Sequence, residues 1–229
     1  MYRKLICLVS FIVVLGLVGD VQAAYVKWTG AGADNLWSTA ANWEGGAVPA
    51  SADEALVNAL PGPTVANDGA EVTRVWVSGG RGSSTDAGVL TVDGGTLKIG
   101  VSLTLASGAS GDGTFSVNSG TVDVTWLKVG NKGIGTLNVT GGTVNATNTL
   151  RIPGEGGGTG RVNLDGGVIT TNKLLMGEPE GSVCAMVLML LALIMYGDKV
   201  ATIQEYIDNG WITAFNGNGR LELGYDVAE

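Results

Sequence analysis

Hydrophobic and polar residues alternate in short runs through the middle of the chain, and this pattern returns four times. Each return opens with a glycine, continues as an alternating run and ends in a turn, in the segments 88–95, 113–120, 135–142 and 160–167. Two further alternating runs follow each segment. Period-two alternation is typical of β-strands with one buried face. The pattern therefore predicts three short strands in each repeat of 22 to 25 residues.

Three short strands per repeat suit one coil of a parallel β-helix. The alternation turns six apolar side chains of the first full coil inward: Leu90, Val92, Leu97, Ile99, Leu103 and Leu105. One coil buries too little apolar surface to offset the entropy lost in ordering it, so coils must stack. We predict an all-β protein, a right-handed parallel β-helix over residues 88–180. An antiparallel sandwich is the competing fold.

The segment before the repeats, residues 24–87, predicts an N-terminal cap and an irregular first coil. Alternation within 53–77 resembles one coil, and 74–77 matches the third strand of the repeats. Three tryptophans precede it: Trp28, Trp37 and Trp43. Since an uncovered coil exposes apolar surface, large side chains that close the end are the favoured interpretation. An aromatic binding platform is the alternative.

The segment after the repeats, residues 181–229, predicts a last coil and a C-terminal cap. Apolar residues at helical spacing predict a helix over 199–208, with Gly210 just beyond its end. Two short runs around 216–219 predict a hairpin. Helix and hairpin together would close the far end of the solenoid.

Fourteen consecutive apolar residues at 183–196 interrupt the alternation. A coil would turn about half of them into water, and the run is short for a membrane span. Three interpretations remain open: a local departure from a normal coil, such as a reading-frame slip, a buried cap helix, and a weak membrane or partner contact. We expect the chain to aggregate through this apolar strand.

The N-terminal residues 1–23 have the pattern of a secretory signal peptide. Two basic residues precede an apolar run at 5–18, and small side chains at Val21 and Ala23 offer a cleavage site. An uncleaved anchor helix is the alternative. We expect a secreted or cell-surface protein, with no integral membrane span in the mature chain. Cleavage would leave one cysteine, Cys184, and therefore no internal disulfide.

Composition and charge exclude several classes of catalytic and binding site. The chain has no histidine, which excludes histidine-based triads and most catalytic zinc sites. Its formal net charge of −8 argues against a nucleic-acid-binding coat. The glycine-rich segment 154–160 lacks the Gly-Lys-Ser/Thr of a P-loop. We expect no metal, no cofactor and no nucleic-acid partner.

The predicted third strands carry a distinctive outward surface, the strand-three face. Its first column holds Arg74, Ser102, Trp126, Thr149 and Lys173, and its second column holds Trp76, Thr104, Lys128, Arg151 and Leu175. Lys128 and Arg151 would stand about 4.8 Å apart, which is unfavourable unless an anion binds. Tryptophan faces beside cations suit sugar rings that carry carboxylate or sulfate groups. The candidate binding residues are Arg74, Trp76, Trp126, Lys128, Arg151 and Lys173; a merely solvated sheet face is the alternative.

The spacing of tryptophans before the coils, the Gly-x-Leu-x-Val-x-Gly-Gly coils themselves and the segment Tyr206-Ile-x-x-Gly-Trp-Ile-Thr-Ala214 resemble a known family. They are similar to secreted bacterial β-helix repeat proteins of the autotransporter-passenger type, often associated with PEP-CTERM or dockerin tails. The resemblance implies an exported, surface-associated protein more than any activity. No sorting tail follows the predicted hairpin, so a fragment of a longer protein is an open alternative.

The function predicted from these features is a structural or adhesion module of a cell surface or matrix. Binding of anionic polysaccharide by the strand-three face is the second hypothesis. A polysaccharide lyase or hydrolase is the third, and it needs clustered or facing carboxylates. The outward acids Asp93, Asp123 and Asp165 are scattered over different columns. We therefore expect a protein without catalytic residues; its oligomeric state stays open.

Overall fold

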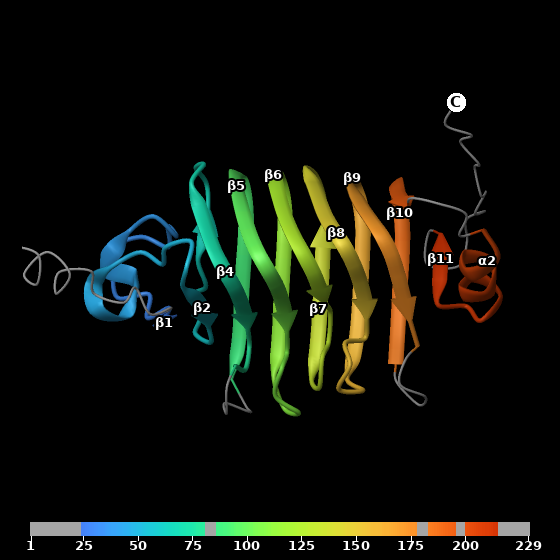
Figure 1. Cartoon of the computed structure of the whole chain (residues 1–229), viewed down its shortest axis with the longest axis horizontal. Helices are drawn as coiled ribbons and strands as arrows, with labels where there is room; N and C mark the ends of the chain where they lie inside the picture. Colours follow the sequence, from blue (N-terminus) through green and yellow to red (C-terminus); the bar gives the residue numbers. More distant parts are fainter. Residues whose placement is uncertain (1–23, 81–85, 178–182, 196–199, 215–229) are drawn as a thin grey trace, which may run out of the picture.

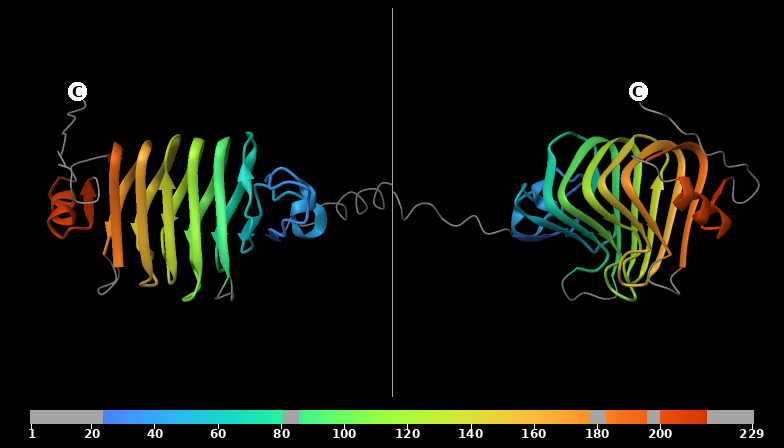
Figure 2. Two further views of the ribbon diagram at one scale, coloured as in Figure 1. Left: turned by 180° about the vertical axis from the view of Figure 1, so that it is seen from behind. Right: turned by 45° about the vertical axis from the view of Figure 1, so that its right-hand side comes forward.

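A computed structural model describes residues 24–80, 86–177, 183–195 and 200–214. The predicted signal peptide and the second arm of the predicted C-terminal hairpin lie outside these residues. The described residues form one long parallel β-solenoid, with its strands stacked along a single axis (Figure 1). Figure 2 shows the chain winding from coil to coil.

The described residues form one continuous sheet of eleven strands with a few short helical segments. In chain order the elements are β1 (Tyr25–Lys27), η1 (Ala40–Asn42), η2 (Glu44–Gly46), β2 (Glu54–Val57), β3 (Thr64–Val65), β4 (Ala70–Val77), β5 (Ala87–Leu105), β6 (Asp112–Lys128), β7 (Ile134–Val139), β8 (Thr143–Ile152), β9 (Thr159–Met176), β10 (Val183–Met195), α2 (Val200–Asp208) and β11 (Ile212–Ala214).

Every pairing between these strands is parallel, which confirms the β-helix and shows that the sandwich alternative is wrong. Strands β5, β6 and β9 run around most of a coil. Between β5 and β6 the register shifts near Asp93 and again between Ile99 and Ser102, so each coil has three straight segments as expected. The right-handed sense of the winding stays a prediction.

Apolar side chains fill the interior in stacked columns. The six side chains predicted to point inward in the first full coil are at most 3% exposed, which confirms their placement. One core column runs through four successive coils and consists of Leu90, Phe115, Leu137 and Val162, all fully buried. Stacking thus buries each coil against its neighbours, and this burial is the main source of stability.

The glycine that opens each repeat has a steric cause. A Cβ atom would lie 2.2 Å from Val57 O at Gly88 and 2.0 Å from the Gly130 backbone nitrogen at Gly135. Real Cβ atoms do not approach other atoms so closely. The chain therefore enters each coil so near the end of an earlier third strand that only glycine fits.

The irregular first coil differs from the prediction over 53–77. Strand β2 pairs with residues 74–77 of β4, so it is the third strand of the preceding coil. Strand β1 pairs in turn with β2. The sequence pattern missed this because these early third strands are separated by irregular chain. The match of 74–77 to the third strand is confirmed.

The three N-terminal tryptophans are packed inside the protein, so the aromatic-platform alternative is wrong. Trp28, Trp37 and Trp43 are at most 2% exposed. Trp43 makes edge-to-face contacts with both others, with ring centroids 5.1 Å from Trp28 and 4.7 Å from Trp37. The segment lies at the β1 end of the solenoid (Figure 1). That it acts as a cap stays a prediction.

Strand β10 continues the solenoid through the apolar run at 183–196. It pairs in parallel with β9, with register shifts around Leu190. The buried-helix interpretation is therefore wrong for 183–195, because these residues form a strand that pairs with the preceding coil. Cys184 is partly buried and forms no disulfide.

The helix predicted over 199–208 is confirmed as α2, apart from Lys199, which is outside the described residues. Gly210 follows it with φ +70°, and its N–H donates to Ile207 O while the Trp211 N–H donates to Tyr206 O. These two hydrogen bonds form a Schellman C-terminal motif. Strand β11 then pairs in parallel with β10. Within the described ranges, none of the helices has the length and apolar character that a membrane crossing requires.

Candidate binding groove on the strand-three face

The ten residues assigned to the strand-three face stand in two columns with the predicted register. Arg74 pairs with Ser102, Ser102 with Trp126, Trp126 with Thr149, and Thr149 with Lys173. The second column pairs in the same way, from Trp76 through Thr104, Lys128 and Arg151 to Leu175. The sequence therefore predicted every neighbour within this face.

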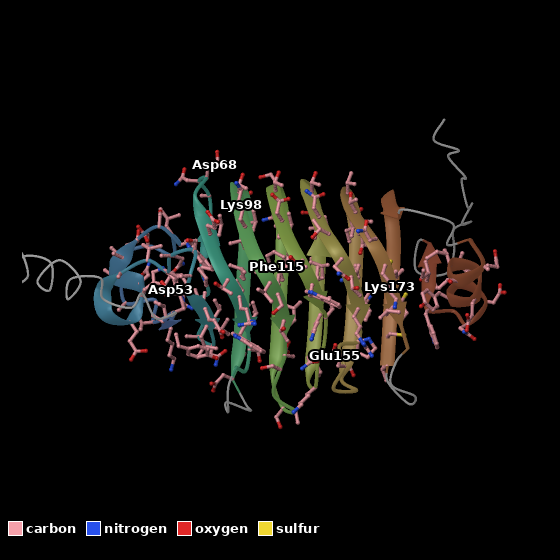
Figure 3. All side chains as sticks on the ribbon, viewed as in Figure 1. Asp53, Asp68, Lys98, Phe115, Glu155 and Lys173 are labelled. Carbon is pink, nitrogen blue, oxygen red and sulfur yellow. The ribbon has the colours of Figure 1, made fainter. Side chains whose placement is uncertain are left out.

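A groove of about 370 Å³ opens on the N-terminal half of this face. Its lining residues come from four coils and their loops: Arg74, Trp76, Val101, Ser102, Thr104, Trp126, Lys128, Asn131 and Glu155. Four of the six candidate binding residues are among them. Arg151 and Lys173 are not, although Arg151 is the strand neighbour of Lys128. Lys173 lies further toward the C-terminal end, as Figure 3 shows.

The two tryptophans of the groove stand on different coils. Trp76 and Lys128 are two coils apart in the second column, and Trp126 lies on the coil of Lys128. At about 4.8 Å per coil, the tryptophans are separated by roughly 9.6 Å along the axis. Between them, Ser102 and Thr104 are almost covered, being 9% and 3% exposed. Trp126 is 39% exposed, so its ring is available to a ligand.

Arg74 and Trp76 share a partner that the sequence analysis missed. Glu54 of β2 lies beside Arg74 in the first column, and its Oε1 accepts a hydrogen bond of 2.7 Å from the Arg74 guanidinium. Its Oε2 accepts one of 3.1 Å from the Trp76 indole. The Glu54 side chain is 8% exposed. This buried carboxylate therefore fixes both side chains at one end of the groove.

A second unpredicted carboxylate, that of Glu155, lies at the other end. Lys128 Nζ donates to its Oε2 at 2.9 Å, and Arg151 Nη1 is 3.8 Å from its Oε1. The expectation that Lys128 and Arg151 repel each other unless an external anion binds is wrong, because this carboxylate bridges them. The hydrogen bond from Lys128, aided by the charges of Lys128 and Arg151, lowers the pKa of Glu155.

The groove holds no evident metal site. Within the part of the chain that the structure describes, no three Cys, Asp or Glu side chains gather where they could hold an ion. The outward acids instead accept hydrogen bonds from neighbouring coils: Ser119 donates to Asp93, and Asn145 donates to Asp123.

Fold and groove together define a class, a parallel β-solenoid with a tryptophan-and-cation groove on one sheet face. Comparison of the chain with protein-family models, with curated proteins and with solved structures gave no match. The resemblance to exported β-helix repeat proteins therefore stays a prediction from the motifs.

Proposed function

We propose that the protein is an exported structural or adhesion module of a cell surface or matrix, and that its groove binds polysaccharide bearing acidic groups. One observation carries the binding proposal: Trp76 and Trp126 line the same open groove as Arg74 and Lys128. Aromatic faces stack on sugar rings, while cations bind carboxylate or sulfate groups.

The solenoid supports this proposal because it holds the groove residues on paired strands. Trp76, Trp126 and Lys128 each belong to a ladder with a neighbour on both sides. Their backbones are therefore fixed before a ligand arrives, which lowers the entropy cost of binding.

Among the described residues, the strand-three face carries more cations than the carboxylates that contact them. Three of the four cations of the two columns contact a carboxylate: Arg74 contacts that of Glu54, and Lys128 and Arg151 contact that of Glu155. Lys173 is exposed and has no ion pair among the described residues. This local excess lies on a chain of net charge −8, and it favours an acidic glycan over a basic partner.

The geometry supports a hydrolase less well. Glu54 and Lys128, which the Glu155 carboxylate contacts, are three coils apart, or about 14 Å of axial rise. Glycosidase carboxylates lie within roughly 10 Å of each other. A general acid also needs a raised pKa, whereas the pKa of Glu155 is lowered. We therefore place this function behind glycan binding.

The binding proposal is tested with immobilised heparin and polygalacturonate at low ionic strength. Replacing Trp126 by alanine removes the exposed ring, and we expect the affinity to fall about 2- to 10-fold, as the loss of an aromatic contact implies. Ile134→Ala is the matched control, because Ile134 is 54% exposed on another strand segment. A wild-type protein that binds neither glycan would overturn the proposed function.

A further inference from the structure

The Glu155 carboxylate lies where an acidic group of a ligand would lie. It contacts Lys128 at 2.9 Å and Arg151 at 3.8 Å, on two adjacent coils of the second column. The two cationic side chains are only 23% and 21% exposed, whereas that of Glu155 is 55% exposed. The two cations are thus partly desolvated, while the carboxylate that they share remains open to water.

The backbone beneath Glu155 is held in place by close packing. A Cβ atom at Gly154 or Gly156 would lie 2.6 Å or less from Asn131 or Lys132 of the preceding loop. The Gly156 N–H also donates to the Asn131 side chain, at 3.3 Å. Since the backbone is fixed, the carboxylate can leave the cations only by rotation of its own side chain.

Glu54 provides the contrast at the other end of the groove. Its side chain is 8% exposed, and its two oxygens accept hydrogen bonds from different side chains, Arg74 and Trp76. Displacing it from Arg74 and Trp76 would take two hydrogen bonds from a buried carboxylate, which is strongly unfavourable. The Glu155 carboxylate is half exposed, so water can solvate it when it leaves the cations, and a ligand can replace it.

We infer that Lys128 and Arg151 form an anion subsite of the groove, and that Glu155 occupies it as an internal competitor of the ligand. The ligand group is a carboxylate or a sulfate of an acidic glycan. On binding, the Glu155 side chain rotates into water, and the acidic group takes its place between the two cations. This inference rests on the proposed glycan-binding function and adds to it the position of the acidic group.

Glu155→Gln is the decisive variant, because it keeps the size of the side chain and removes the competing charge. We expect it to bind heparin and polygalacturonate about 3- to 10-fold more tightly than the wild type at low ionic strength. The gain should shrink as salt is added, since salt screens the exposed charges. A neutral glucan should show no gain.

Asp165→Asn is the matched control, because it removes the same charge at an exposed position of β9 outside the strand-three face. It should leave the affinity nearly unchanged, which separates a local effect from a change in net charge. In the double variant with Lys128→Gln and Glu155→Gln, the gain should disappear. Heparin alone showing the gain would assign the subsite to sulfate, and polygalacturonate alone would assign it to carboxylate.

The outcomes separate the two proposals. If the wild type binds acidic glycan and Glu155→Gln binds it equally well or less tightly, the competitor inference is wrong while the proposed function stands. If neither protein binds any glycan, both are wrong. Melting curves of all variants verify that the fold is intact.

Discussion

The two groups of tryptophans in this protein have opposite environments. Trp28, Trp37 and Trp43 are buried against each other at the β1 end, whereas Trp76 and Trp126 face outward from regular third strands. Within a coil, alternation decides which side chains face the core, so an indole at an outward position stays at the surface. The side of the strand, more than the residue type, decides whether a tryptophan packs in the core or lies at the surface.

The largest effect should come from removing the central ring of the buried group. Trp43→Ala deletes contacts with both neighbouring indoles, and we expect it to lower the free energy of unfolding by about 3–5 kcal/mol. Trp126→Ala should lower it by no more than about 2 kcal/mol, because a large part of its ring is already in water. Denaturant unfolding of both variants measures the difference. Equal losses would show that the exposed tryptophan also has a packing role.

A smaller effect should distinguish two members of the buried group. The Trp43 indole N–H donates to Trp37 O at 2.7 Å, whereas the buried Trp37 indole N–H has no acceptor among the described residues. Replacing Trp43 by phenylalanine removes a buried hydrogen bond and should cost about 1–3 kcal/mol more than the same change at Trp37. Denaturant midpoints of the two variants measure the difference. Equal losses of stability in the two variants would mean that the stability depends on ring volume and not on the hydrogen bond.

Much of the fold and of the strand-three face could be predicted because both depend on strict periodicity. Once the repeats are aligned, each residue pairs with its counterpart one coil away. The alignment therefore predicts both the outward direction of a side chain such as Trp126 and its neighbours. The alignment failed where coils were irregular: Glu54 lies directly before Arg74 in the first column, and comparing 54–57 with 74–77 would have revealed it.

The position of Glu155 had no such signal in the sequence. It lies in a loop between β8 and β9, where neither alternation nor coil spacing determines the direction of a side chain. The contact with Lys128 depends on how the 154–158 segment packs on residues 131–133, through approaches that only glycine permits. The sequence alone therefore does not show whether a column of cations on a strand is paired with acidic residues from a loop; the structure is needed for this.

The smallest effect should be the pH dependence of the stability that Glu155 contributes in the groove of Trp76 and Trp126. Lys128 lowers the pKa of Glu155 in the folded state, so the wild type gains stability from the ionised carboxylate above the range in which an unfolded glutamate titrates. This gain, at most about 1 kcal/mol for so exposed a pair, should fade as the pH drops through the lowered pKa. Glu155→Gln should therefore be slightly less stable than the wild type at neutral pH and equal to it in acid, as melting temperatures across the pH range can show. A stability gap that persists in acid would mean that Glu155 acts through packing, and its exchange with a ligand anion would then lose its electrostatic basis.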